Sequence, residues 1–145
     1  MNLATVPHSI VALVLYALWV IALVLMVGAD RVLQVMRGEA AITSFTPGMQ
    51  HGTDSYWRIN RAHMNAAENL AVFAAIVLAG WVAGEESATF NLLAEIVIVA
   101  RVIQSVIHIW SGSPTAINLR FTAFAVQLIS EIWMALLVLH TANLF

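Results

Sequence analysis

The feature that most constrains this chain is an apolar run over residues 9–29, which contains no charged side chain. A helix needs roughly 20 apolar residues to cross the ~30 Å hydrocarbon core of a bilayer. The run is longer than the ~7–15 residues of a signal-peptide core, and no basic leader precedes it. It therefore predicts a first membrane span that stays in the protein.

Three further segments are long and apolar enough to span a membrane, although each carries charge. They are residues 61–83 with Glu68, residues 87–110 with Glu95 and Arg101, and residues 121–140 with Glu131. Of the 145 residues, 61% are hydrophobic and 10% are charged, which is more apolar than a soluble domain of this size. The sequence predicts an all-α membrane protein with a single domain over residues 1–145.

The links between the four spans differ in length and composition. Residues 38–55 form a long polar link, whereas residues 84–86 and 111–118 form short ones. Short links make successive helices antiparallel neighbours, which is the arrangement of an up-and-down four-helix bundle. We therefore expect a four-transmembrane-helix antiparallel bundle.

The arginines predict the orientation of the bundle. Five of the six lie beside the first and third links, namely Arg31, Arg37, Arg58, Arg61 and Arg120, and the sixth is Arg101 in the third span. The positive-inside rule places these links in the cytoplasm and both termini on the other side of the membrane. The chain has no lysine and a net charge of −2, so it lacks the basic patch of a nucleic-acid-binding protein, and nucleic acid is excluded as a partner.

Polar residues form a stripe on the second span. Arg61, Asn65 and Glu68 are spaced i, i+4 and i+7, so a helix places them on one face, which Arg58 and Asn69 extend. Charged residues at membrane depth usually face a bundle interior or a wet cavity and mark function. The alternative is that the arginines reach to lipid headgroups while the amides and Glu68 bond neighbouring helices. Glu68 fits that alternative least well because it lies deeper.

The third span carries a second stripe, in which Arg101, Gln104 and His108 are spaced i, i+3 and i+7. We expect the two stripes to face each other. His108 alone is more often a hydrogen-bonding residue between helices than a catalyst. Glu95 and Glu131 are expected to pair with Arg101 or with a neighbouring subunit.

Several kinds of site are excluded. No two histidines have ligand spacing and no HExxH motif occurs, so we predict no metal. The chain has no cysteine and no phosphate-binding glycine loop. What remains is a pocket with arginines, amides and a carboxylate, which suits a small molecule bearing carboxylates, peptide groups and an ammonium. Glutathione has these groups, and a nearby arginine would stabilise its thiolate.

The stretch RAHMNAAEN at residues 61–69 resembles the RAxxNxxE signature of the MAPEG family, the membrane-associated proteins in eicosanoid and glutathione metabolism. This group includes the microsomal glutathione transferases. The resemblance covers nearly the whole chain, because the length, the four spans and the long first link also agree. It implies a homotrimer that holds glutathione between neighbouring subunits near the cytoplasmic side.

The resemblance also implies roles for individual residues. It implies glutathione contacts from Arg31, Arg61, Asn65, Glu68, Asn69, Gln104 and His108, and a catalytic role for Arg120, at the start of the fourth span, in holding the thiolate. A headgroup anchor is the alternative for Arg120, and a salt bridge with Asp30 is the alternative for Arg31. Gln104 and His108 stand where many eukaryotic members have tyrosines, and Asn69 where some have an aromatic residue.

Two functions from different classes are compatible with the sequence. The first is a glutathione-dependent transferase or peroxidase that acts on a small hydrophobic electrophile from the bilayer. The second is a non-catalytic MAPEG-like protein whose stripes hold a trimer together or bind lipid or another anion, which the missing third-span tyrosines favour. A transporter is disfavoured because no span has a Gly/Pro interruption at mid-membrane. The expected location is a bacterial inner membrane, with further copies of the chain and membrane lipids as partners.

Overall fold

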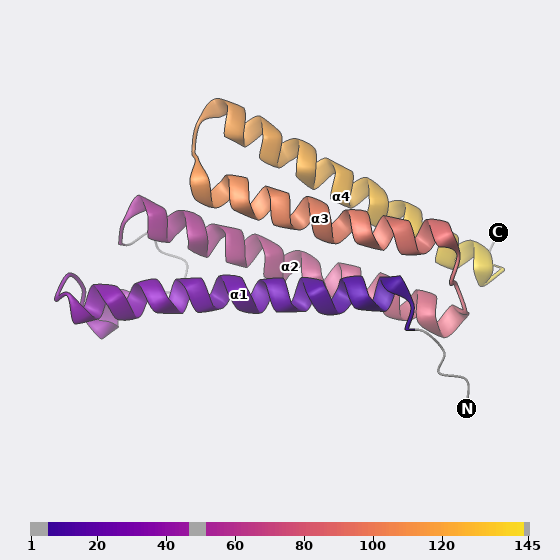
Figure 1. The fold of residues 1–145 in the computed structure, drawn as a ribbon, viewed down its shortest axis with the longest axis horizontal. Helices are drawn as coiled ribbons and strands as arrows, with labels where there is room; N and C mark the ends of the chain where they lie inside the picture. Colours follow the sequence, from indigo (N-terminus) through magenta and orange to yellow (C-terminus); the bar gives the residue numbers. More distant parts are fainter. Residues whose placement is uncertain (1–5, 47–51, 144–145) are drawn as a thin grey trace.

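The computed structural model describes residues 6–46 and 52–143, which fold into a bundle of long helices. The elements in chain order are α1 (His8–Met36), the 3₁₀ turn η1 (Ile42–Ser44), α2 (Asp54–Ala83), α3 (Ala88–Trp110) and α4 (Pro114–Thr141). Figure 1 shows successive long helices running in opposite directions, so that α1 begins and α4 ends at the same end of the bundle. All four long helices have the length and apolar composition to cross a membrane. The prediction of an all-α, four-span bundle is confirmed.

α1, α2 and α4 extend beyond the predicted spans, because hydropathy detects only the part of a helix that a bilayer would cover, whereas α3 matches its predicted span to within one residue. α1 continues to Met36 and α2 begins at Asp54, where the Thr53 side chain accepts a hydrogen bond from the backbone N–H of Tyr56 at 3.1 Å. Such caps satisfy backbone donors that have no partner within the helix. The extra turns bring polar residues into the helices.

The third link is shorter than predicted. α4 begins at Pro114, with the Ser113 hydroxyl accepting a hydrogen bond from the N–H of Ala116 at 3.3 Å. A serine cap followed by proline at the first helical position is a strong start signal, because proline lacks the N–H that would have no helical partner there. The prediction that the link runs to residue 118 is therefore wrong, and Arg120 lies in the second turn of α4.

Large apolar side chains cover much of the outside of the bundle. Leu25 is 65% exposed, Val82 86% and Trp110 82%, while aromatic and aliphatic residues such as Phe73 and Val97 fill the interior. Soluble monomers rarely expose contiguous apolar surface on this scale. This distribution is that of a protein whose solvent is lipid.

Close packing of α2 against α3 depends on Gly80. A Cβ atom at this position would lie 2.5 Å from Cζ of the fully buried Phe90 ring. We expect Gly80→Ala to lower the free energy of unfolding by about 1–3 kcal/mol, the usual effect of overpacking. Thermal unfolding in one detergent measures it. Gly28→Ala is the matched control, because no described atom beyond the local backbone of α1 lies within 4 Å of its added methyl group. Equal effects of the two variants would contradict this account.

The turn between α2 and α3 is joined to the end of α4 by the buried carboxyl of Glu85. It accepts hydrogen bonds from the Ser87 N–H at 3.1 Å and from the Thr141 hydroxyl. Gly84 precedes it with φ +74°, a conformation that favours glycine. Burial raises the pKa of the Glu85 carboxyl, but the hydrogen bonds from Ser87 and Thr141 outweigh burial and hold the pKa below its usual value.

The depressed pKa of Glu85 predicts how stability depends on pH. A carboxyl whose pKa is lower in the folded state stabilises the fold at pH values above its unfolded pKa, and this contribution is lost as pH falls through the folded pKa. We expect Glu85→Gln to lose less stability than the wild type as the pH falls below the ordinary glutamate pKa of 4.5. Thermal unfolding between neutral and acidic pH measures this. An unchanged acid limb in Glu85→Gln would show that other groups dominate.

Candidate functional site

A polar pocket lies along one side of α2, where the sequence predicts the first stripe. It has a volume of about 270 Å³ and is lined by Trp57, Arg61, Met64, Asn65 and Glu68. The prediction that Arg61, Asn65 and Glu68 share one helical face is confirmed. The Arg61 guanidinium lies 5.9 Å from the centre of the Trp57 ring, which is within the range of a cation–π contact.

The pocket offers a defined set of binding groups. Arg61 can donate to a carboxylate, Glu68 can accept from an ammonium, and the amide of Asn65 can do either. Arg61 and Glu68 are both exposed on the single chain. A small molecule carrying both signs of charge could therefore reach all three groups without a change in the fold.

The second stripe meets the first at Arg101. Its Nη1 donates to Oδ1 of Asn65 at 2.5 Å and to Oε1 of Gln104 at 2.6 Å. The expectation that the two stripes face each other is confirmed. Gln104, predicted to contact a ligand, is only 8% exposed and is bonded to Arg101, away from the lining of the α2 pocket.

Arg101 is the residue of this region that the sequence analysis did not assign to the site. It is 1% exposed and its guanidinium carbon lies 5.7 Å from the centre of the Tyr16 ring on α1. Its position at mid-span, three residues before Gln104, is the signal that could have identified it. A buried arginine is costly unless its donors are paired. Here Nη1 is paired, with Asn65 on α2 and with Gln104 on its own helix, whereas Nε and Nη2 have no hydrogen-bond partner within the described part of the chain.

Glu131 on α4 lies within electrostatic range of Arg101. Its Oε1 accepts a hydrogen bond from Nε2 of Gln127 at 2.9 Å, and both side chains are buried. The expected pairing of Glu131 with Arg101 is therefore met as electrostatic proximity, while the hydrogen bond of the Glu131 carboxyl is with Gln127. Glu95 instead accepts from Nδ1 of His8 at 2.7 Å, so its predicted pairing with Arg101 is wrong within the chain.

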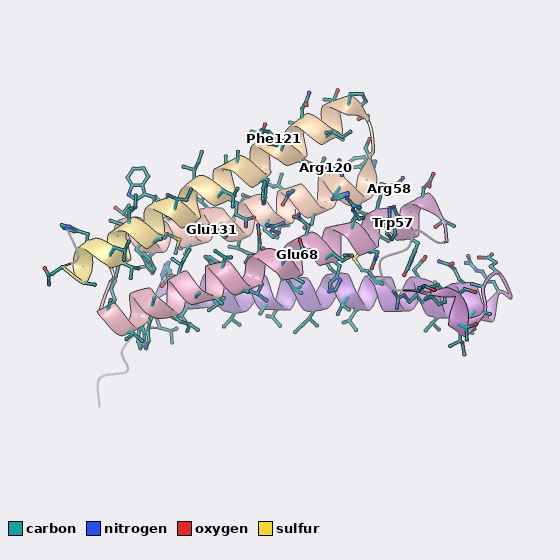
Figure 2. All side chains as sticks on the ribbon, turned by 180° about the vertical axis from the view of Figure 1, so that it is seen from behind. Trp57, Arg58, Glu68, Arg120, Phe121 and Glu131 are labelled. Carbon is teal, nitrogen blue, oxygen red and sulfur yellow. The ribbon has the colours of Figure 1, made fainter. Side chains whose placement is uncertain are left out.

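Arginines from α2 and α4 converge on His108 of α3 at the end of the bundle opposite the start of α1. His108 on α3 is half-buried and lies within electrostatic range of Arg120, Arg61 and Arg58. Nε of Arg58 donates to the carbonyl of Ile109 at 3.1 Å, which ties the start of α2 to the end of α3. Figure 2 shows Trp57, Arg58 and Arg120 at this end, with Glu68 further along α2.

Two predicted site residues lie elsewhere in the single chain. Nε of Arg31 donates to the Tyr56 hydroxyl at 2.7 Å, and its guanidinium lies 5.3 Å from the centre of the Phe45 ring. The Asp30 carboxylate takes a hydrogen bond from Gln34 at 2.5 Å rather than forming the local salt bridge with Arg31. Asn69 has a buried Nδ2 atom with no hydrogen-bond partner within the described part of the chain.

Sequence comparison assigns the family. The profile of the MAPEG family matches residues 9–140, which is nearly the whole chain. This chain belongs to the MAPEG family. No curated protein matches it significantly. In this MAPEG chain Arg61, Asn65 and Glu68 of the RAxxNxxE signature line the α2 pocket, so residues that first indicated the family also form a polar cavity. Membership establishes a multi-pass membrane protein of the kind found in glutathione and eicosanoid metabolism.

Proposed function

We propose that this MAPEG protein is a glutathione-dependent transferase or peroxidase acting on small hydrophobic electrophiles. The observation that carries the proposal is the α2 pocket, in which Arg61, Asn65 and Glu68 line one cavity. A carboxylate of glutathione would bind Arg61, its ammonium would bind Glu68, and its peptide groups would bond Asn65. The electrophile would enter from the surrounding lipid, because the bundle lies in the bilayer.

The exposure of the pocket supports a homotrimer. In a single protomer, Glu68 and Arg61 would be open to lipid, where charged groups are costly and rarely found. A neighbouring copy that covers this face of α2 would exclude lipid and complete the site. Arg31 does not line the α2 pocket of its own chain. In the trimer it would contact the glutathione bound in the pocket of an adjacent subunit.

Arg120 is proposed as the residue that stabilises the glutathione thiolate. Its proximity to His108, together with Arg58 and Arg61, supports a strongly positive end of the bundle. A cation beside a thiol favours the ionised form, and the thiolate is the reactive nucleophile. Coulomb attraction in a partly desolvated site can supply the few kcal/mol that lower the pKa of a thiol toward 7.

Binding of glutathione to the purified protein tests the proposal. We expect Arg61→Ala and Glu68→Gln each to raise the Kd by about 10- to 100-fold, the loss that follows removal of a charged hydrogen bond. Isothermal titration calorimetry measures the Kd, and native mass spectrometry measures the oligomeric state. Arg37→Ala is the control, because Arg37 is exposed just beyond α1 and lines no part of the α2 pocket.

The outcomes separate the two functions that the sequence left open. Loss of glutathione binding in the two variants, with the trimer intact, supports the proposal. A wild-type trimer that binds no glutathione would overturn it in favour of a non-catalytic protein that binds lipid or another anion. Dissociation of the trimer in Arg61→Ala or Glu68→Gln would assign these residues to assembly instead.

A further inference from the structure

The Asn65 side chain has two kinds of contact, one with the α2 pocket and one with a buried arginine. Its side chain lines the α2 pocket, while its Oδ1 accepts the 2.5 Å hydrogen bond from Nη1 of Arg101. Arg101 does not line that pocket and is 1% exposed. A ligand in the pocket would touch Asn65 and would not touch Arg101.

The chemistry of Arg101 determines which way the Asn65 amide faces. A guanidinium has N–H donors and no acceptor, so only the carbonyl oxygen of the amide can face it. The NH₂ group of Asn65 is then the end that remains for the pocket. Without Arg101, the amide could rotate by half a turn and present its oxygen to a ligand instead.

Arg101 is itself held from several helices, so it can impose this orientation. On α3 its Nη1 also donates to Oε1 of Gln104 at 2.6 Å. Its guanidinium lies 5.7 Å from the Tyr16 ring centre on α1, and Glu131 on α4 is within electrostatic range. Arg101 is 1% exposed and packed against several helices, and Nη1, the atom that contacts Asn65, is also bonded to Gln104. A side chain held in this way supports a fixed geometry in the residue it contacts.

We propose that Arg101 is a positioning residue that fixes the Asn65 amide as a hydrogen-bond donor toward the α2 pocket. The pocket then selects a ligand with an acceptor at that point, such as a carboxylate or a peptide carbonyl. The inference rests on the proposed function, because the thiol peptide supplies that acceptor. It adds a specificity-determining residue that no ligand would contact directly.

A double-mutant cycle on the full-length protein tests the proposal with glutathione as the probe. We expect Asn65→Ala and Arg101→Met each to raise the Kd by about tenfold, and the double variant to raise it no further than either one. Arg101→Lys should retain most of the affinity, because an ammonium is also only a donor. Arg37→Met is the matched control for replacing an arginine and should leave the Kd unchanged.

Asn65→Asp provides a second test that does not depend on the stability of Arg101→Met. Aspartate keeps an oxygen toward Arg101 but has no NH₂ group for the pocket. We expect the ligand-free Tm to be maintained or raised, while the Kd for glutathione rises by about tenfold or more. A general structural role of residue 65 would instead lower the Tm and the affinity together.

The possible results distinguish this inference from the proposed function. Non-additive effects in the cycle, with affinity retained in Arg101→Lys, support the inference. If the wild-type protein binds glutathione but the effects of Asn65→Ala and Arg101→Met on the Kd are additive, the inference is overturned and the proposed function stands. The same holds if Asn65→Asp binds glutathione as tightly as the wild type does. A wild-type protein that binds no glutathione would overturn both.

Discussion

Replacement of Arg120 by alanine is expected to lower turnover with glutathione by about 100-fold or more, comparable to removing one donor from an oxyanion site. Arg120 lies in the second turn of α4, within electrostatic range of His108. The proposed role of its guanidinium is to stabilise the glutathione thiolate, which is negatively charged, relative to the neutral thiol. The rate of conjugation of a chloronitrobenzene substrate measures turnover, and ultraviolet absorbance of the bound thiolate reports its ionisation.

Two further variants make the Arg120 prediction specific. Arg120→Lys should retain part of the turnover because it keeps a positive charge, whereas Arg37→Ala should retain all of it. Binding of glutathione should change far less than turnover in Arg120→Ala, since Arg61, Asn65 and Glu68 would still hold the peptide. Equal losses of affinity and turnover would show that Arg120 binds the ligand rather than activating its thiol.

Replacement of Glu131 by leucine is expected to have the largest effect on stability, a loss of about 3–5 kcal/mol. Glu131 is 3% exposed, and its carboxyl is within electrostatic range of the buried Arg101. Leucine would leave the buried Gln127 amide without its acceptor and would remove a carboxyl within electrostatic range of the buried Arg101 guanidinium. Denaturation in mixed detergent micelles, followed by the helical circular dichroism signal, measures the loss.

The control for Glu131→Leu is Glu95→Leu, which removes a carboxylate from the surface of α3. The Glu95 side chain is 48% exposed and its partner His8 is 75% exposed. Exposed pairs of this kind contribute about 0–1 kcal/mol. A similar loss of stability in the two variants would mean that Arg101 does not depend on Glu131.

Much of the fold could be predicted from the sequence because membrane spans follow from length and apolar content. The ends of the helices could not, since charged and polar side chains interrupt the apolar pattern over residues 30–36 and 54–60, and hydropathy alone does not assign these residues to a helix. Local signals were present at Thr53 and at Ser113 with Pro114, and they mark the true starts of α2 and α4. Hydropathy predicts which residues lie in the bilayer, whereas capping residues predict where the helix begins.

The site could be predicted in part, for a related reason. Helical periodicity placed Arg61, Asn65 and Glu68 on one face, and the pocket lies there. Helical periodicity does not predict which hydrogen-bond partner each polar side chain will have in the folded chain. Gln104 could bond a ligand or Arg101 with the same spacing, and in the folded chain its Oε1 accepts from Arg101 on the same helix. The spacing of residues within one chain also cannot predict contacts that a second copy of the chain would supply.

Five arginines lie toward one end of the bundle, opposite the end where α1 begins and α4 ends (Figure 1). They are Arg31, Arg37, Arg58, Arg61 and Arg120. This distribution of charge affects how the chain inserts into a membrane. With the usual inside-negative membrane potential, moving one charge across the bilayer involves about 2.3 kcal/mol per 100 mV. Five arginines toward one end of the bundle would therefore oppose dual topology, and we expect every copy to insert in the same orientation. All copies of the α2 pocket would then draw on the same aqueous thiol pool and release their product near the same leaflet.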